Sequence, residues 1–243
     1  MRSYRVHSHS DLVVGQPAAL DERSSHHLAR VLRVKVGDAV TVFNGDGNNY
    51  YSRVSALSKT CVTVDLLSSE HPANESPLTT HLGLAVSKGD RFDWAIKKAT
   101  ELGVSSISPI LSQRVDVRLS SDRWKKKQEH WQQIVVSACE QSGRAVVPEV
   151  FAPKPLADWV KVADADYKFC LHPGMSDALP TARPNSVSLL IGPEGGLSNE
   201  EVTLASDHGF LGLNLGPRIL RTETAPLVAL SVFGTQWGDL SVI

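Results

Sequence analysis

The sequence predicts an α/β protein in which a small, mostly β domain precedes a larger domain built on a mainly parallel sheet. Three observations support this class. Short β-type runs crowd the first 70 residues. A polar, Pro-containing run follows, and beyond it apolar strand candidates alternate with helical segments. The 243 residues suffice for both domains. We place the boundaries at 1–71 for the β domain, 72–77 for a linker and 78–243 for the α/β domain.

The β domain is predicted from three apolar runs and one helical segment. Residues 39–43 form a strand candidate that ends at the turn-rich run Asn44-Gly45-Asp46-Gly47. Residues 50–57 and 61–67 alternate or cluster apolar side chains in the manner of two more strands. A short helix is expected over 24–32. Several short strands in so small a segment favour a compact barrel.

The α/β domain begins with a βαβ unit. Strand candidates at 82–87 and 107–111 flank a helix predicted over 91–102, and Gly103 stands where a helix C-terminal glycine belongs. The alternation continues to the C-terminus, which predicts a parallel sheet with helices on both faces. Its further elements are a long helix at about 123–141 and strands at 169–171, 187–191 and 213–215.

Composition argues against several classes of protein. No run of eighteen apolar residues occurs, so no membrane span is predicted. The start of the chain lacks a signal-peptide pattern, and Cys61, Cys139 and Cys170 are isolated, so we expect buried thiols in a cytoplasmic protein. The histidines, such as the pair His26-His27, show no metal-binding spacing. We therefore expect neither a metal nor a membrane partner.

The net charge of −1 hides an uneven distribution of charge along the chain. Residues 77–130 carry ten basic and six acidic side chains, whereas residues 151–210 carry four basic and eight acidic ones. A basic face of this kind can contact phosphates while the remaining surface stays acidic. Its densest part is the run Arg123-Trp124-Lys125-Lys126-Lys127. A solvated helix face explains the same charges equally well.

Two glycine-containing segments show the strongest signs of a site. Residues 189–198, LLIGPEGGLS, lead from an apolar strand into a helix that Ser198 and Glu201 begin with a capping box. Residues 213–225, LNLGPRILRTETA, lead through a Gly-Pro loop into a second helix. Glycines let a ligand approach the main chain closely, and ligands bind beyond the carboxyl ends of parallel strands. Each segment alone is more often a simple connection, but the pair favours a binding site. Neither matches the dinucleotide motif GxGxxG or a phosphate loop.

Both segments resemble the C-terminal signatures of the RsmE family in the SPOUT superfamily. The resemblance extends to KGDRFDWAIKKATELGV at 88–104, SACEQSGRAVVPEV at 137–150 and HHLARVLRVKVGD at 26–38. Five matching segments in the family's order span nearly the whole chain. Together they are far more selective than any single glycine loop.

The resemblance implies both a fold and an activity. The β domain would be a PUA-like β-barrel that helps to bind RNA. The α/β domain would be a knotted SPOUT methyltransferase domain, whose trefoil knot is an exception to the usual unknotted connections. The cofactor would be S-adenosylmethionine (SAM) and the active form a homodimer. The reaction would be methylation of N3 of a uridine in 16S ribosomal RNA of the small ribosomal subunit, at the uracil-1498-type position.

The resemblance also implies a cofactor site made of three loops. Main-chain groups of such loops can bind the adenine edge, which explains their Gly and Pro content. The chain departs from the family's pattern in SQRVDV, which keeps the arginine, Arg114, but changes its neighbours. It departs again at Pro226, for which we expect a shifted helix start. The cofactor residues carried over are His172, Pro173, Ile191, Gly192, Pro193, Glu194, Gly195, Gly196, Leu215, Gly216, Arg218, Ile219, Leu220, Thr222, Thr224 and Ala225.

Methyl transfer to uracil N3 requires alignment of the reactants and removal of the N3 proton. A cation near O2 or O4 would stabilise the uracil anion, and Arg114, Arg144 and Arg221 are the candidates by motif position. Glu140 or Glu223 would accept the proton. Each arginine is interpreted equally well as a phosphate contact or a surface ion pair. For the glutamates, a role at a helix start is the favoured interpretation.

RNA contacts are expected from basic side chains in both domains. Such contacts release counterions, so the salt dependence of binding tests them. The candidates are Arg2, Arg5, Arg30, Arg33, Lys88, Lys125, Lys126 and Lys127.

Two alternatives to this function stay open. An enzyme of the same fold can methylate a ribose 2′-hydroxyl or a transfer-RNA base, and the chemical position of the product separates these reactions. The chain can also be a non-catalytic RNA-binding or ribosome-assembly factor. Cofactor binding distinguishes that protein from an enzyme.

Overall fold

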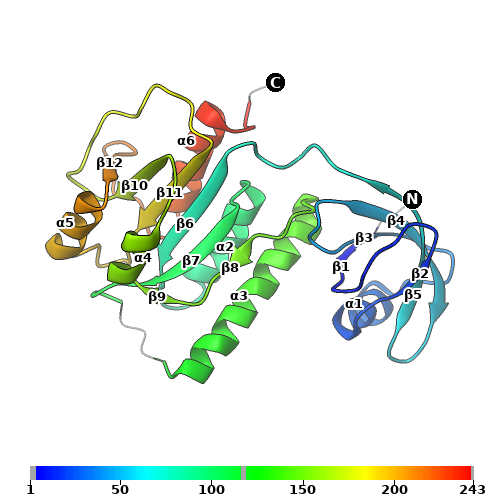
Figure 1. Cartoon of the computed structure of the whole chain (residues 1–243). Coiled ribbons are helices and arrows are strands. Elements are labelled where there is room, and N and C mark those ends of the chain that lie inside the picture. Colours follow the sequence, from blue (N-terminus) through cyan, green and yellow to red (C-terminus); the bar gives the residue numbers. More distant parts are fainter. Residues whose placement is uncertain (1–3, 116–118, 242–243) are drawn as a thin grey trace. The chain divides into compact units, whose positions relative to one another are not determined.

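The computed structural model describes residues 4–115 and 119–241, which fold as two compact units (Figure 1). The first unit takes residues up to 75, and the second begins at Ser76. Residues 139–147 also belong to the first unit, although the sequence alone assigns them to the α/β domain. They comprise the end of the long helix α3 and the segment after it. The chain therefore contributes to the first unit twice.

The first unit is a five-stranded sheet with one short helical segment. The strands follow the order β1-β3-β4-β5-β2, in which β1 and β3 are parallel and the other pairs antiparallel. The predicted strands over 39–43, 50–57 and 61–67 are confirmed as β3, β4 and β5. The elements are β1 (Tyr4–His7), β2 (Pro17–Ala19), α1 (Glu22–His26), η1 (His27–Leu32), β3 (Ala39–Phe43), β4 (Asn49–Leu57) and β5 (Val62–Glu70).

The helix predicted over 24–32 is confirmed only in part. It forms α1 and then widens into η1, a π-helical segment. Arg33 ends it in a left-handed conformation with φ of 55°. A local change of helix type has no clear periodicity signal in six residues, so the pattern gave a single helix.

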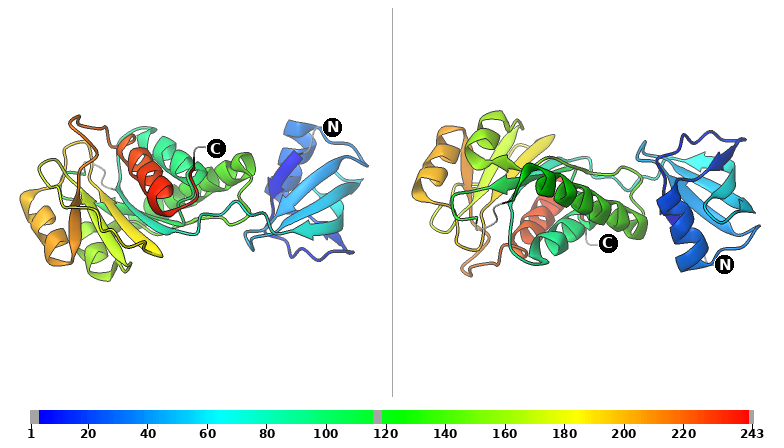
Figure 2. Two further views of the ribbon diagram at one scale, coloured as in Figure 1. Left: turned by 90° about the horizontal axis from the view of Figure 1, so that it is seen from above. Right: turned by 90° about the horizontal axis from the view of Figure 1, so that it is seen from below.

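The second unit is a parallel sheet covered by helices on both faces. The strands follow the order β12-β10-β11-β6-β7-β8, and β9 pairs with the end of β7. Figures 1 and 2 show α2, α3 and α6 over one face, and α4 and α5 over the other. The elements are β6 (Thr79–Ala85), α2 (Arg91–Glu101), β7 (Ser106–Leu111), α3 (Ser121–Ser142), β8 (Glu149–Val150), β9 (Lys154–Pro155), α4 (Leu156–Val162), β10 (Tyr167–Leu171), β11 (Ser186–Ile191), α5 (Asn199–Asp207), β12 (Phe210–Leu213) and α6 (Ala225–Trp237).

The packing of this unit follows from its apolar spacing. Phe92, Ala95, Ile96 and Ala99 are buried along one side of α2, at the spacing of an amphipathic helix. The Phe92 ring packs on Trp131 of α3, with ring centroids 4.4 Å apart. The βαβ arrangement predicted around α2 is therefore confirmed, because β6 and β7 are parallel neighbours.

The strand predicted at 213–215 is wrong in its position. The observed strand β12 is Phe210–Leu213, directly after Gly209 with φ of +81°. At Asn214 the chain already turns, because its side-chain oxygen accepts a hydrogen bond from Gly216 N at 2.9 Å. An Asn side chain can replace a strand partner in this way. The pattern also missed β1, β2, β8, β9 and α4, which are short.

Candidate active site

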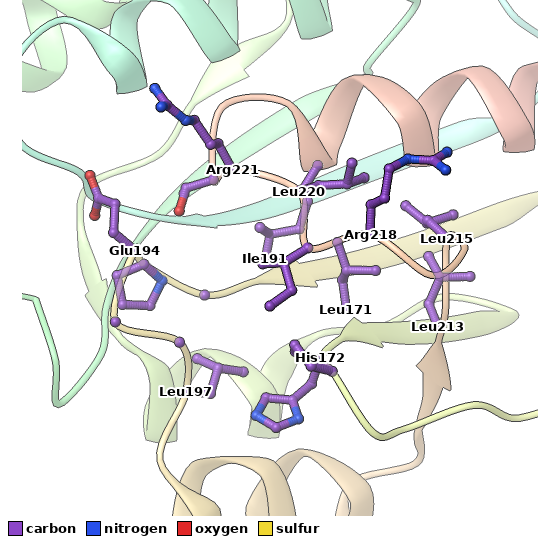
Figure 3. A pocket seen from close by; sticks show the side chains of 18 of the residues that line it. Leu171, His172, Ile191, Glu194, Leu197, Leu213, Leu215, Arg218, Leu220 and Arg221 are labelled. Carbon is purple, nitrogen blue, oxygen red and sulfur yellow. The ribbon is translucent and has the colours of Figure 1, made fainter.

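Three loops meet at one edge of the parallel sheet. They follow β10, β11 and β12, whose carboxyl ends lie side by side because the strands are parallel neighbours. Residues 171–174, 191–197 and 213–223, together with Ala225, help to line a single cavity of about 820 Å³ (Figure 3). Ligand pockets typically measure about 300–1,000 Å³. The cavity therefore has the size and the place of a ligand site in an open α/β sheet.

The cavity has an apolar centre and charged edges. Figure 3 shows Ile191 and Leu220 gathered in its middle. The charged side chains of Glu194 and Arg221 lie toward one side, and that of Arg218 lies at the other. Such a lining suits a ligand with an apolar or aromatic body and polar ends.

The loop after β11 passes so close to its own continuation that only glycine fits. A Cβ on Gly192 would lie 2.9 Å from Leu197 Cγ and 3.2 Å from Leu197 N. The loop then turns at Pro193, whose carbonyl accepts a hydrogen bond from Gly196 N at 2.8 Å. Gly196 has φ of +69°, which favours glycine. These two constraints fix the main chain along the cavity.

Helix α5 begins with the predicted capping box. Ser198 accepts a hydrogen bond from Glu201 N, and Glu201 Oε2 accepts one from Ser198 N at 2.9 Å. The other oxygen, Oε1, accepts a hydrogen bond from Gln113 N at 2.7 Å. The buried Glu201 carboxylate therefore joins the loop after β11 to the segment after β7, and both its oxygens are engaged.

The loop after β12 reaches α6 through a short turn. The Arg221 carbonyl accepts hydrogen bonds from Thr224 N and Ala225 N, both at 2.9 Å. Helix α6 then begins at Ala225 with Pro226 in its first turn, where proline is tolerated. Glu223 lines the cavity, and its Oε2 is buried without a hydrogen-bond partner among the described residues. An orphaned buried carboxylate oxygen is unusual and favours a positively charged or hydrogen-bonding ligand.

Two arginines outside these loops hold the loop after β11 from the side. Arg91 forms an ion pair with Glu194, with 2.8 Å between Nη1 and Oε1. Arg114 donates a hydrogen bond from Nη1 to the Gly195 carbonyl at 2.7 Å. Arg91 and Glu194 are 48% and 37% exposed, so their pairing positions side chains more than it stabilises the fold.

A second hollow of about 550 Å³ adjoins the cavity. The two share Arg91, Arg114, Glu194 and Gly195 as wall residues. The remainder of the hollow is lined by Val86, Lys88, Gly89, Asp90 and Val115. It is therefore rich in charge of both signs, whereas the cavity has an apolar centre.

Comparison with known proteins identifies the family. Residues 74–234 match the RNA methyltransferase domain, and residues 20–67 match the RNA methyltransferase PUA domain. The chain is 34% identical over 241 residues to ribosomal RNA small subunit methyltransferase E of Buchnera aphidicola, with 98% of each chain covered. The chain belongs to the ribosomal RNA small subunit methyltransferase E family. The resemblance found in the sequence is thereby confirmed.

Solved structures of similar proteins agree with this membership. A methyltransferase of Legionella pneumophila, in complex with the bound cofactor SAM, has 40% identity and a TM-score of 0.94, and the match covers 99% of this chain and 100% of that one. Ribosomal RNA small subunit methyltransferase E of Neisseria gonorrhoeae, bound to SAM, has 36% identity and a TM-score of 0.92, with the same coverage. The fold is therefore the fold of this methyltransferase E family.

The cofactor residues predicted from the family resemblance converge on the cavity. Every one of the sixteen except Thr224 is among the residues that line it. The prediction missed Arg91, and it missed further lining positions at the strand ends and loops, namely Leu171, Gly174, Leu197, Leu213, Asn214 and Pro217. Leu171 and Leu213 are the last residues of β10 and β12. The predicted strand at 169–171 ends correctly at Leu171, whereas the strand predicted at 213–215 lies too late in the chain to mark Leu213 as a strand end.

The five residues of this chain that were predicted to be catalytic fall into two groups by position. Arg114, Arg221 and Glu223 line the cavity. Glu140 and Arg144 lie in the segment that belongs to the first unit and are not among the cavity's described lining residues. Their catalytic roles remain predictions, because neither residue is among the described residues that line the cavity.

Glu140 and Arg144 make contacts that support the first unit. Glu140 Oε1 accepts a hydrogen bond from His7 N at 3.0 Å. Arg144 is buried and pairs with Glu75, with 2.6 Å between Nη2 and Oε2. These contacts hold the returning segment against the first unit, and they favour a structural role.

The predicted RNA-contacting residues differ in exposure. Arg30, Arg33, Lys88, Lys125 and Lys126 are exposed, whereas Lys127 is half-buried, with its ammonium 5.2 Å from the centroid of the Trp131 ring. Arg2 lies outside the described residues. Arg5 is half-buried; it lies over the Phe43 ring and donates a hydrogen bond to the Arg144 carbonyl at 2.7 Å. Arg5 therefore supports the first unit, whatever it contributes to RNA.

Among the described residues, no helix is long and apolar enough to cross a membrane, and no cluster of His, Cys, Asp and Glu side chains has the makeup of a metal site. Cys139 and Cys170 are buried thiols, as predicted, and Cys61 is half-buried. Burial raises the pKa of Cys139 and of Cys170 to about 12. Both thiols are therefore neutral near pH 7 and are poor nucleophiles.

Proposed function

We propose that the protein transfers a methyl group from SAM to N3 of a uridine in 16S ribosomal RNA of the small ribosomal subunit, at the uracil-1498-type position. The observation that carries this proposal is the cavity at the ends of β10, β11 and β12. Fifteen residues expected from the family line it, and similar proteins were solved with SAM bound.

The residues present fit SAM. The cavity volume of about 820 Å³ suits a ligand of that size, and its apolar centre around Ile191 and Leu220 suits an adenine ring. The orphaned Oε2 of Glu223 offers a negative charge to the cationic parts of the ligand. When bound, SAM supplies an electrophilic methyl group on a positively charged sulfur.

The protein's own residues would bind and position the reactants. The loops at 191–197 and 213–225 would hold the cofactor largely through main-chain groups, because their glycines leave the backbone accessible. Arg114 and Arg221, at the cavity wall, would stabilise negative charge that develops on the uracil oxygens. Positioning of the acceptor nitrogen behind the methyl carbon would supply much of the rate.

The proposal extends to the type of each domain and to the assembly of the protein. We assign to the first unit a PUA-like barrel that contacts RNA, to the second a trefoil knot, and to the active protein a cytoplasmic homodimer. The knot is consistent with the segment 214–224, which leads from β12, at the sheet edge, to α6, which packs against α2. Light scattering of the purified protein tests the dimer.

Methyl transfer from labelled SAM to purified ribosomal particles tests the proposal. Small subunits from cells that lack the modification should accept label, whereas large subunits should not. A protein that binds SAM and labels only large subunits or transfer RNA would refute the proposed substrate. A protein that does not bind SAM would instead be a binding factor.

A further inference from the structure

The second hollow has the chemistry of a site for the methyl acceptor. It opens beside the cavity and shares Arg91, Arg114, Glu194 and Gly195 with it, so a ligand in either one lies next to the other. Its volume of about 550 Å³ is within the range of small-molecule sites. Of the carboxylates that line it, that of Asp90 forms no ion pair within the described part of the chain, whereas that of Glu194 does.

The Asp90 carboxylate is available although its position in the chain favours capping. Asp90 is the residue before α2, where an Asp side chain usually accepts a hydrogen bond from the first turn. Here it makes no such bond. It is exposed, and within the part of the chain that the structure describes it forms no ion pair. The nearby carboxylate of Glu194 is different, because Arg91 already pairs with it at 2.8 Å.

The residues that line the hollow include the donors and the acceptor that one edge of a uracil base requires. The Watson–Crick edge of uracil presents an acceptor, a donor and an acceptor, namely O4, N3–H and O2. Its complement is a donor, an acceptor and a donor. Lys88, Arg91 and Arg114 carry only donors, whereas ionised Asp90 is only an acceptor. Cytosine carries a hydrogen-bond acceptor at N3, and the Asp90 carboxylate would repel it because the carboxylate is also an acceptor.

We propose that this hollow binds the target uracil and that Asp90 accepts the N3 proton, with cationic side chains of the hollow facing O2 and O4. This inference rests on the proposed function and adds to it a base site and a proton acceptor. Asp90 replaces Glu140 and Glu223 as the acceptor, because neither glutamate is among the described residues that line this hollow.

The step balances in atoms and charge. Uracil N3 forms a bond to the methyl carbon, and the carbon–sulfur bond of the sulfonium breaks with its electron pair left on sulfur. The N3–H bond breaks, its electrons stay on the base, and its proton passes to the Asp90 carboxylate. A sulfonium and a carboxylate become a neutral thioether and a carboxylic acid, which then releases its proton to water.

Single-turnover methylation of unmodified small subunits tests this role. Asp90→Asn should lower the rate about 100- to 1,000-fold, the usual contribution of a general base. SAM affinity, measured by calorimetry, should stay within about twofold of wild type. Asp158→Asn removes an exposed carboxylate from the first turn of α4, outside both hollows, and should keep the wild-type rate.

The pH dependence separates proton transfer from a structural effect. Without Asp90, only uracil that has already lost its N3 proton reacts, so the rate of Asp90→Asn should rise about tenfold per pH unit from pH 6 to 9. Wild type should show a much flatter profile. Subunits that contain 5-fluorouridine, whose N3 proton is more acidic, should react with a smaller difference between variant and wild type. Asp90→Ser, which suits the position before a helix but carries no carboxylate, should behave like Asp90→Asn.

Binding gives a readout that does not depend on turnover. Wild type should bind unmodified subunits more tightly than subunits that already carry the methyl group, because the latter lack N3–H. Asp90→Ala should lose this preference. A rate within about threefold of wild type, or a reduced rate with an unchanged pH profile, would overturn the role of Asp90. A large loss of SAM affinity would assign the hollow to the cofactor instead. A wild-type protein inactive on small subunits would refute the proposed function itself.

Discussion

Gly192 offers the sharpest test of how the cavity is built. The loop after β11 passes Leu197 so closely that a Cβ on Gly192 would lie 2.9 Å from Leu197 Cγ, 3.0 Å from Cδ2 and 3.2 Å from the main-chain nitrogen. Favourable carbon contacts begin at about 3.5 Å. Leu197 is only 2% exposed and cannot move into solvent, so Gly192→Ala must displace the loop.

The cost of this substitution follows from the overlap. Overpacking of a dense interior typically costs about 1–3 kcal/mol. If the strain falls on the bound loop conformation, it weakens SAM binding about 5- to 150-fold. If it falls on the fold, it lowers the melting temperature of the second unit by about 2–12 °C. Either effect is readily measured, and a mixture of the two is expected.

Calorimetry with SAM and a thermal melt measure both effects. Gly195→Ala is the matched control in the same loop, because its Cβ would lie 3.5 Å from Arg114 Cβ, an ordinary contact distance. The control should melt within about 2 °C of wild type. Gly192→Ala with unchanged SAM affinity and an unchanged melting temperature would show that the loop is not held against Leu197 as described.

Three further predictions concern buried charge. Arg144→Ala should lower the free energy of unfolding of the first unit by about 3 kcal/mol in urea, because it breaks a largely buried ion pair. If Arg144→Ala lowers that free energy equally in a Glu75→Gln background, the two side chains do not stabilise the fold through their ion pair. Burial lowers the pKa of His7 and of His81 to about 4 from 6.5, so both are neutral when folded. Each therefore contributes stability that is present above about pH 6.5 and lost as the pH falls toward 4, and His81→Gln should lessen this acid sensitivity. An unchanged pH profile of unfolding in that variant would contradict the assignment. If Glu223 faces the sulfonium, Glu223→Gln should weaken SAM binding about tenfold but the binding of S-adenosylhomocysteine, which lacks that charge, by less than about threefold. Equal losses would refute a role at the sulfonium.

Local sequence signals predicted the parts of the structure that depend on local interactions. The capping box of Ser198 and Glu201 is one example, because its two hydrogen bonds join residues three apart. The buried face of α2 is another, because its spacing repeats with the helix turn. The family resemblance located the cofactor loops for a related reason, since each loop is a continuous run of sequence.

Contacts between distant segments were not predictable in the same way. Arg91 pairs with Glu194, which is 103 residues away, and no local pattern joins the two. Arg144 carries a family motif, yet it pairs with Glu75 because the chain returns to the first unit after α3. A motif position indicates that an arginine matters, but only the fold shows which partner it contacts.

The chemical identity of the methylated nucleoside tests the proposed reaction best. The purified protein would be incubated with SAM and small ribosomal subunits that lack the modification, and the nucleosides of the 16S ribosomal RNA would be analysed by mass spectrometry. We expect 3-methyluridine, formed in proportion to the added subunits. A 2′-O-methylated nucleoside, or no methylated nucleoside from a protein that binds SAM, would contradict it.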